Sequence, residues 1–263
     1  MSLLEIRELT VAFDQYERGL RRRVVTALSG MDLSADTGEV VALVGASGAG
    51  KSLLAHAVLG LLPPNAREGG EVRYDGAVVA RAARRGLAGR EIALLPQSVS
   101  FLDPLARVGA QVRRAAVLAG VADPAEAAVA ALRRRGLGPD VPRRYPHELS
   151  GGMARRVLIA MATLGRARLV LADEPTPGLQ QDGARAVLAE LREIADGGSA
   201  VVLITHDLPG ALDVADRVVI CHEGRTVDAV TPADFRADAL SHPYTHALWR
   251  ALPANGFHTG EED

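Results

Sequence analysis

Apolar runs alternate with helical patterns through most of the chain, which is typical of a parallel sheet with helices on its faces. Buried strands are predicted at residues 39–44, 168–172 and 200–204, and a glycine-rich turn and a helix over residues 52–61 follow the first of them. The two later strands each end in polar residues. Because such sheets bind ligands at the carboxyl ends of their strands, chemistry is expected at that edge.

A smaller antiparallel layer is predicted near the N-terminus. Residues 4–11 alternate apolar and polar side chains, which indicates a strand with one buried face. Residues 71–74 and 77–79 flank the turn signal Asp75-Gly76, which favours a β-hairpin.

Helical signals replace strand signals in the middle of the chain. Asp123 is a predicted N-cap, and Pro124 would occupy the first position of the helix that follows it. We therefore predict a helical subdomain at about residues 98–154, inserted into a sheet domain over residues 1–240. A short C-terminal tail over residues 241–263 completes the expected organisation.

Composition excludes several classes of function. The formal net charge of −2 gives no basic excess for phosphate backbones, so no nucleic-acid partner is expected. Cys221 is the one cysteine, which excludes an internal disulfide and a cysteine metal cluster and favours a packed apolar role. Apolar stretches fall short of the roughly 20 residues that span a bilayer, and residues 1–8 carry charges unlike a signal peptide. A soluble cytoplasmic chain is expected.

Residues 45–52, Gly-Ala-Ser-Gly-Ala-Gly-Lys-Ser, match the phosphate-binding loop pattern between a predicted strand and a predicted helix. Backbone N–H groups of such a loop point at phosphate oxygens, and the helix N-terminus adds its positive dipole end. Lys51 is the one lysine among 30 basic residues, and a compact ammonium enters a tight loop where arginine's planar fork does not. The expected nucleotide-binding residues here are Gly45, Ser47, Gly48, Ala49, Gly50, Lys51 and Ser52, with the Ser52 hydroxyl also on Mg²⁺.

Two adjacent acids, Asp173 and Glu174, end the predicted strand at 168–172. Two carboxylates beside a phosphate would repel it unless they perform different tasks. Asp173 is expected to hold Mg²⁺ through water, and Glu174 to polarise the attacking water as general base. The alternative is that both acids are solvated and simply open the turn before Pro175.

A second glycine-rich segment, Ser150-Gly151-Gly152, begins a helical run and is again suited to phosphate. The order of the phosphate-binding loop, Gln97, this segment, the acid pair and His206 resembles the ABC ATPases over nearly the whole chain. The resemblance implies an α/β P-loop NTPase fold: an ABC-type ATPase domain with an antiparallel β subdomain and an inserted helical subdomain.

Roles follow from the resemblance residue by residue. Gln97 resembles the glutamine that reaches the metal and the attacking water and links the site to a permease. His206 resembles the histidine that contacts the γ-phosphate. Phe13 resembles the aromatic residue that stacks on adenine, with Tyr16 as the alternative, and either could instead be a core residue.

The resemblance also implies partners. Ser150, Gly151 and Gly152 would serve the ATP held by a second ATPase subunit, identical or different, so that two chains share each site. Two transmembrane permease subunits would bind the pair at the cytoplasmic face of the membrane, and a solute-binding protein would act indirectly. Two residues depart from the family pattern: Met153 stands where glutamine is commonest, and Gln180 where aspartate is usual. The second change puts coupling between the two sites in question.

The segments 101–105 and 242–253 resemble the oligopeptide, dipeptide and nickel importer branch of the family. Many peptide transporters of that branch carry a longer C-terminal extension with several cysteines, so we expect nickel or another chelated metal as cargo, with peptides as the alternative. Two other hypotheses stay open. One is a soluble ABC protein acting on ribosomes or DNA, and the other, motivated by Gln180, is a nucleotide-binding regulator that no longer hydrolyses ATP.

Overall fold

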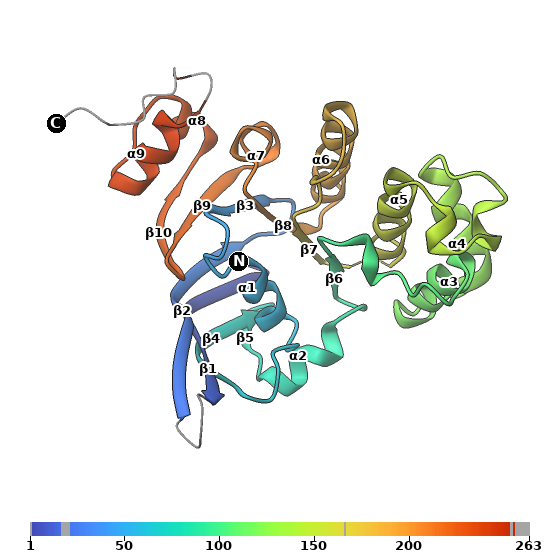
Figure 1. The fold of residues 1–263 in the computed structure, drawn as a ribbon, viewed down its shortest axis with the longest axis horizontal. Helices are drawn as coiled ribbons and strands as arrows, with labels where there is room; N and C mark the ends of the chain where they lie inside the picture. The colour runs from blue at the N-terminus through green and yellow to red at the C-terminus, as the bar shows by residue number, and fades with distance from the viewer. Residues whose placement is uncertain (1, 17–21, 166, 253–254, 256–263) are drawn as a thin grey trace.

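A computed structural model describes residues 2–16, 22–165, 167–252 and 255 (Figure 1). Its strands are β1 (Leu4–Tyr16), β2 (Arg22–Ala35), β3 (Val40–Gly45), β4 (Ala66–Tyr74), β5 (Ala77–Val78), β6 (Ile92–Leu95), β7 (Leu169–Asp173), β8 (Ala200–Thr205), β9 (Arg217–His222) and β10 (Arg225–Val230). They form one sheet with the order β5-β4-β1-β2-β10-β9-β3-β8-β7-β6.

The helices surround this sheet. They are α1 (Lys51–Val58), α2 (Arg81–Leu87), α3 (Val108–Leu118), α4 (Pro124–Arg134), α5 (Gly151–Ala162), α6 (Gln181–Asp196), α7 (Leu208–Val214), α8 (Pro232–Arg236) and α9 (Pro243–Arg250). Short 3₁₀ turns occur at Val99–Phe101, Val141–Arg143 and Pro146–Glu148. Among the described residues, every helix is too short or too polar to cross a membrane.

The centre of the sheet is parallel and buried on both faces. β3 pairs in parallel with β8 and β9, and β7 pairs in parallel with β8 and β6. Every residue of β3, β7 and β8 is buried, as expected for the continuous apolar runs of a covered parallel sheet. The three predicted strands are thereby confirmed, and their carboxyl ends meet at one edge.

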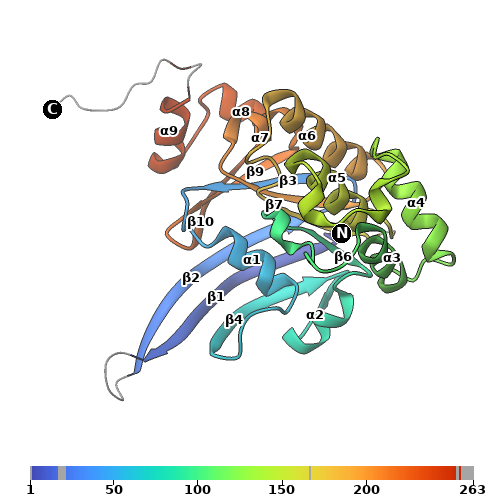
Figure 2. The ribbon, with the colours of Figure 1, turned by 45° about the vertical axis from the view of Figure 1, so that its right-hand side comes forward.

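The predicted antiparallel layer is present, but it is continuous with the same sheet. β1 pairs antiparallel with β2 and β4, and β4 turns into β5 through Asp75 and Gly76, both in the left-handed region. A single parallel pair, Arg225 with Gly30, joins this arm to the centre within the described residues. Figure 2 shows the arm curling away beneath α1.

Two apolar cores lie on opposite faces of the sheet. One packs α1 between the antiparallel arm and the centre, and the other packs α5, α6 and α7 against the far face. The described residues between β6 and β7 form helices and turns, and they project from one end of the molecule as α3, α4 and the start of α5 (Figure 1). The predicted cap is confirmed, because the Asp123 carboxylate accepts a hydrogen bond from the Glu126 amide. α5 continues to Ala162, so it connects this region to the sheet.

The C-terminal helix α9 is anchored on β9 and β10. The Thr245 hydroxyl, fully buried, donates to Asp228 Oδ2 at 2.8 Å, and the rings of Tyr244 and His222 stack at 4.0 Å. The apolar side chains of Tyr244, Leu248, Trp249 and Leu252 therefore pack on the domain.

A buried ion pair holds the C-terminal end of α1. Arg84 is 3% exposed, pairs with Glu68 and donates to the Ala57 carbonyl oxygen at 2.7 Å. We expect Arg84→Ala to lower the free energy of unfolding by about 3–5 kcal/mol, because the Glu68 carboxylate loses its buried partner. Arg85→Ala should cost about 1 kcal/mol or less, since exposed Arg85 makes one bond to Gly60. Urea unfolding measures both. Equal losses in the two variants would contradict the interpretation, and Arg84→Met combined with Glu68→Leu should restore most of the stability.

Candidate functional site

The glycine-rich loop joins β3 to α1 at the carboxyl edge of the sheet. Gly48 and Gly50 have φ angles of 84° and 88°, a region that side chains rarely adopt. Gly50 is the N-cap of α1, and no side chain caps that helix. The N–H groups of its first turn therefore have no side-chain acceptor and are free to bind an anion.

Both ends of the loop are packed too tightly for a side chain. A Cβ on Gly45 would lie 2.1 Å from the carbonyl oxygen of Cys221, and a Cβ on Gly50 would lie 2.3 Å from Leu28 Cδ2. The Cys221 thiol is fully buried and donates to the Ala49 carbonyl oxygen at 3.2 Å. Burial raises the pKa of Cys221, so the thiol stays neutral beneath the loop. The prediction of a packed, apolar Cys221 is confirmed.

Lys51 is held inside the loop. Its side chain is 6% exposed, and Nζ donates to the carbonyl oxygens of Gly45 at 2.8 Å and Ala46 at 2.9 Å. An ammonium has three donors, so two of them stiffen the loop and the third is left for a ligand. No carboxylate among the described residues forms an ion pair with Lys51, and a phosphate oxygen in that place would compensate its buried charge.

Ser52 and Asp173 lie side by side. Ser52 Oγ donates to Asp173 Oδ1 at 2.9 Å, which joins the start of α1 to the end of β7. Burial raises the pKa of Asp173, the Ser52 hydrogen bond opposes that rise, and the neighbouring Glu174 adds to it. The positive charges of His56 and Lys51 also oppose the rise.

The oxygen atoms at this edge fit Mg²⁺. Ser52 Oγ and Asp173 Oδ1 are hard ligands, and Gln97 lines the pocket together with Ser52. The buried Glu174 Oε2 has no hydrogen-bond partner among the described residues. The described residues contain no group of three or more histidines, cysteines or acids that could hold a metal by themselves. Mg²⁺ needs no such cage, because it keeps waters and phosphate oxygens as ligands.

Glu174 has an unusual backbone. Its φ angle is 45°, and its amide donates to the Ile204 carbonyl oxygen at 2.8 Å, which ties the residue to β8. Left-handed backbone at a non-glycine residue costs about 1–3 kcal/mol and is concentrated at active sites. Here it turns the chain immediately after Asp173.

His206 faces the Glu174 carboxylate. Its Nδ1 lies 2.9 Å from both carboxylate oxygens, and the hydrogen bond is directed at Oε1. Thr205 Oγ1 accepts from the Asp207 amide, and Asp207 in turn caps α7, so the residues on both sides of His206 are fixed. The histidine is thus held beside the carboxylate at the end of β8.

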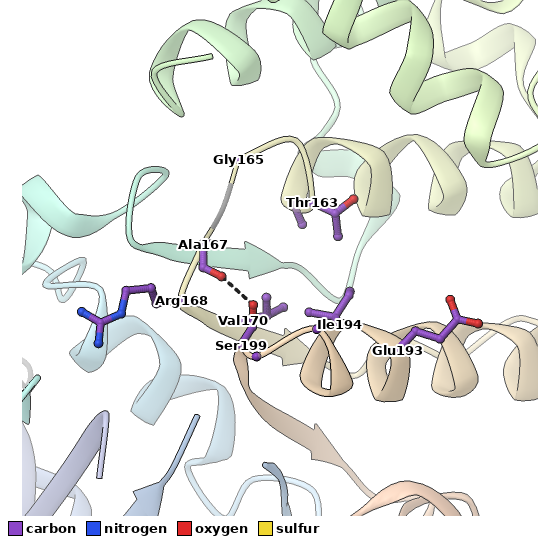
Figure 3. Close-up of a pocket in the computed structure, with 11 residues that line it drawn as sticks. Thr163, Gly165, Ala167, Arg168, Val170, Glu193, Ile194 and Ser199 are labelled. Carbon is purple, nitrogen blue, oxygen red and sulfur yellow. Dashed lines mark hydrogen bonds between the residues drawn. The ribbon is translucent and has the colours of Figure 1, made fainter. Parts of the chain in front are cut away.

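Residues of the loop, with Gln97 and Glu174, line one pocket of about 310 Å³. Its walls are Ser47, Gly48, Gly50, Lys51, Ser52, Leu53, Gln97 and Glu174. A larger hollow of about 470 Å³ lies at the opposite edge, around Arg168, Glu193 and Ser199 (Figure 3). It is at the amino ends of β7 and β8, where Ser199 Oγ donates to the Ala167 carbonyl oxygen, and it contains none of the expected residues.

Eight expected residues do not line this pocket. Gly45, Ala49, Asp173 and His206 lie directly beside residues that line it or contact them, and the other four lie elsewhere. Phe13 is on β1, partly buried against the core beneath the arm, and its stacking on adenine stays a prediction. Ser150, Gly151 and Gly152 begin α5, where exposed Ser150 is the N-cap and accepts from the Met153 amide at 3.2 Å. That these three residues bind the ATP held by a second subunit also stays a prediction. The side chain of Tyr16 lies outside the described residues.

Sequence reasoning missed Arg155. It is 4% exposed on α5, and its guanidinium donates to the carbonyl oxygens of Pro96 and Gln97. The signal in the sequence was its spacing of three and four residues from Leu158 and Ile159, which places Arg155 on the apolar face of α5.

The fold and the site together define an ATPase of the phosphate-binding-loop class, with a lysine-bearing loop and two acids at the end of a neighbouring strand. Residues 28–177 match the family described as ABC transporter. The chain belongs to the ABC transporter family and is an ABC-type ATPase.

Curated relatives agree over nearly the full chain. A probable peptide ABC transporter ATP-binding protein, y4tR of Sinorhizobium fredii, is 36% identical over 95% of this chain and 77% of its own length. The oligopeptide transport ATP-binding protein OppD of Salmonella typhimurium is 34% identical over 95% of this chain and 76% of its own. The dipeptide transport ATP-binding protein DppD of Escherichia coli is 35% identical over 96% of this chain and 79% of its own length.

Solved structures confirm the expected fold. A dimeric post-hydrolysis state of the ATP-binding cassette MJ0796 bound to ADP and Pi has a TM-score of 0.76 at 23% identity, covering 87% of this chain and 98% of that one. An ATP-binding subunit of an ABC transporter has a TM-score of 0.70 at 28% identity, covering 94% of this chain and 99% of that one. The expected ABC ATPase fold is therefore correct.

Proposed function

We propose that this chain powers an importer of peptides, lying against two permease subunits at the cytoplasmic face of the membrane. Three relatives named for peptide, oligopeptide and dipeptide transport support peptides as the cargo. Nickel, favoured by the sequence reasoning, has no specific support among these relatives and becomes the competing outcome of the test. In this proposal the ATPase domain spans residues 1–240, with the helical subdomain at about 98–154.

The observation that carries the proposal is the convergence of Lys51, the Ser52–Asp173 pair and the Glu174–His206 pair at one edge of the sheet. Lys51 and the loop amides bind the triphosphate. Ser52 and Asp173, with Gln97, hold Mg²⁺, which neutralises charge on the phosphate oxygens when it is bound.

Glu174 acts as general base in this proposal. Its carboxylate oxygen Oε2 makes no hydrogen bond among the described residues, although His206 Nδ1 lies 2.9 Å from it, and it would accept a proton from an attacking water. His206 orients the carboxylate from the other side and contacts the γ-phosphate. Each of the two residues directly follows a strand of the central sheet, β7 or β8, which supports precise positioning of their side chains.

The positions of Ser150, Gly151 and Gly152 outside the pocket support a shared site, in which these residues bind the ATP of a second ATPase subunit. The solved cassette described as dimeric supports the same arrangement at the level of the fold. A solute-binding protein would deliver the cargo to the permeases, and this chain would not contact it.

Transport by the reconstituted complex tests the proposal. The tagged chain is purified from membranes of its source cells together with its co-purifying proteins, which are identified by mass spectrometry and placed in proteoliposomes. We expect two permease proteins to co-purify, and uptake of a labelled dipeptide or pentapeptide to require ATP. Uptake of a nickel–histidine chelate in place of peptides would assign nickel as the cargo. A wild-type complex that hydrolyses no ATP would overturn the proposal and favour a regulator.

A further inference from the structure

Arg155 joins α5 to the chain segment that carries Gln97. Nη1 donates to the Pro96 carbonyl oxygen at 2.7 Å, and Nη2 donates to the Gln97 carbonyl oxygen at 2.6 Å. Pro96 and Gln97 follow β6 directly, at the point where the chain leaves the sheet and enters the pocket. One guanidinium therefore donates hydrogen bonds to two successive peptide carbonyls through two separate nitrogen atoms. Lysine lacks this forked arrangement of donors.

The charge of Arg155 is poorly compensated, which argues against a role in packing alone. The side chain is 4% exposed, and no carboxylate among the described residues offsets the burial that lowers its pKa. Burying a cation without an acidic partner is unfavourable, and an apolar side chain would fill the same space without that cost. The two hydrogen bonds to the Pro96 and Gln97 carbonyl oxygens are what offsets the cost of burying this charge.

The two elements joined by Arg155 belong to different parts of the site. α5 begins at Gly151, directly after Ser150, at the exposed surface proposed to face a second subunit. Gln97, an exposed residue, lines the pocket that also contains Lys51 and Glu174. Because Arg155 bonds the Gln97 backbone and leaves its side chain free, a displacement of α5 would carry that side chain with it.

We propose that Arg155 is a positioning residue that ties Gln97 to α5, so that Gln97 takes its place in the pocket only together with α5. The inference rests on the proposed role of Gln97 in the hydrolytic site. Its consequence is a specific kinetic signature: the rate of hydrolysis depends on Arg155, while the affinity for ATP, which the loop at residues 45–52 supplies, does not.

The chain offers a matched control. Arg156 is the next residue of α5, and it is partly exposed and donates to the carbonyl oxygens of Gly152, Arg135 and Gly136 instead of the Gln97 segment. Arg155→Met and Arg156→Met therefore remove the same group from the same helix, and only Arg155→Met removes the link to Gln97.

The test measures kcat and KM for ATP hydrolysis by the full complex, with ATP affinity from calorimetry. Arg155→Met should lower kcat by about ten- to a hundredfold, the scale of a misplaced catalytic group, while KM and ATP affinity change less than about twofold. Arg156→Met keeps the link to Gln97 and should lower kcat clearly less than Arg155→Met does. If Arg155→Met fails to fold, Arg155→Lys keeps the buried charge and can reach one carbonyl, so it should fold and show a smaller loss of kcat.

A double-mutant cycle separates positioning from structural damage. Gln97→Ala removes the side chain but keeps the carbonyl that Arg155 bonds, so Arg155→Met should lower kcat little further in that background. The inference would be overturned if the kcat loss of the double variant equalled the product of the two single losses, or if both Arg155 variants kept a normal kcat. The proposed function would still be supported in either case by the activity of the wild type. A normal kcat in Gln97→Ala would overturn it as well, and an inactive wild type would overturn the proposed function.

Discussion

Glu174→Gln is expected to lower kcat for ATP hydrolysis by about 10²- to 10⁴-fold, the usual contribution of a general base. The amide has nearly the shape of the carboxylate and can keep the contact with His206, but it cannot accept the proton of the attacking water. Affinity for ATP should be retained, because the phosphate contacts come from the loop and Lys51. Phosphate release from the complex and calorimetric titration with ATP measure the two quantities.

Glu223→Gln is the matched control. Glu223 is also a glutamate with left-handed backbone, φ 48°, and its side chain is 82% exposed. The same chemical change at a similar backbone position should leave kcat unaltered. Equal activity of the wild type and Glu174→Gln would remove Glu174 as the base and with it the proposed mechanism.

Lys51→Ala is expected to weaken ATP binding by about 10- to 10²-fold or more. Losing one charge-assisted contact to a phosphate costs about 1.5–3 kcal/mol, and every 1.4 kcal/mol is about tenfold in affinity. The variant also loses the two bonds to the Gly45 and Ala46 carbonyl oxygens, so the loop is less well ordered before ATP arrives. Calorimetry or binding of a fluorescent ATP analogue gives the dissociation constant.

Two further variants make the Lys51 result specific. Arg113→Ala removes one positive charge from an exposed position on α3 and should leave ATP affinity within about twofold, since screened distant charges interact weakly. Lys51→Arg keeps the charge but places a broad planar group in a space closed by two carbonyls, so it should restore little of the affinity. Unchanged affinity in Lys51→Ala would show that the nucleotide binds elsewhere.

The sequence predicted the centre of the fold because the required signals are local. The runs at 39–44, 168–172 and 200–204 are apolar over lengths that suit buried strands, and the structure buries them in β3, β7 and β8. The phosphate-binding loop is likewise a continuous segment whose glycines and position between strand and helix are visible in the printed residues.

Contacts between distant segments could not be predicted in this way. The left-handed backbone of Glu174 depends on its bond to Ile204, 30 residues away, and glutamate has no local preference for it. Gly45 must lack a side chain because the Cys221 carbonyl lies against it, and Arg155 is buried because the Gln97 segment passes over it. The antiparallel strands, expected as a separate layer, join the main sheet through a pairing of Arg225 with Gly30.

By itself the sequence determined which residues carry the phosphate chemistry, and in what order, since residue type and spacing decide what each segment can bind. The tertiary structure alone decided that Lys51, Asp173, Glu174, His206 and Gln97 meet at one edge, and that α5 is tied to Gln97. The physical reason is that strand order in the sheet results from the burial of two apolar faces at once, and this depends on the whole chain rather than on any one segment.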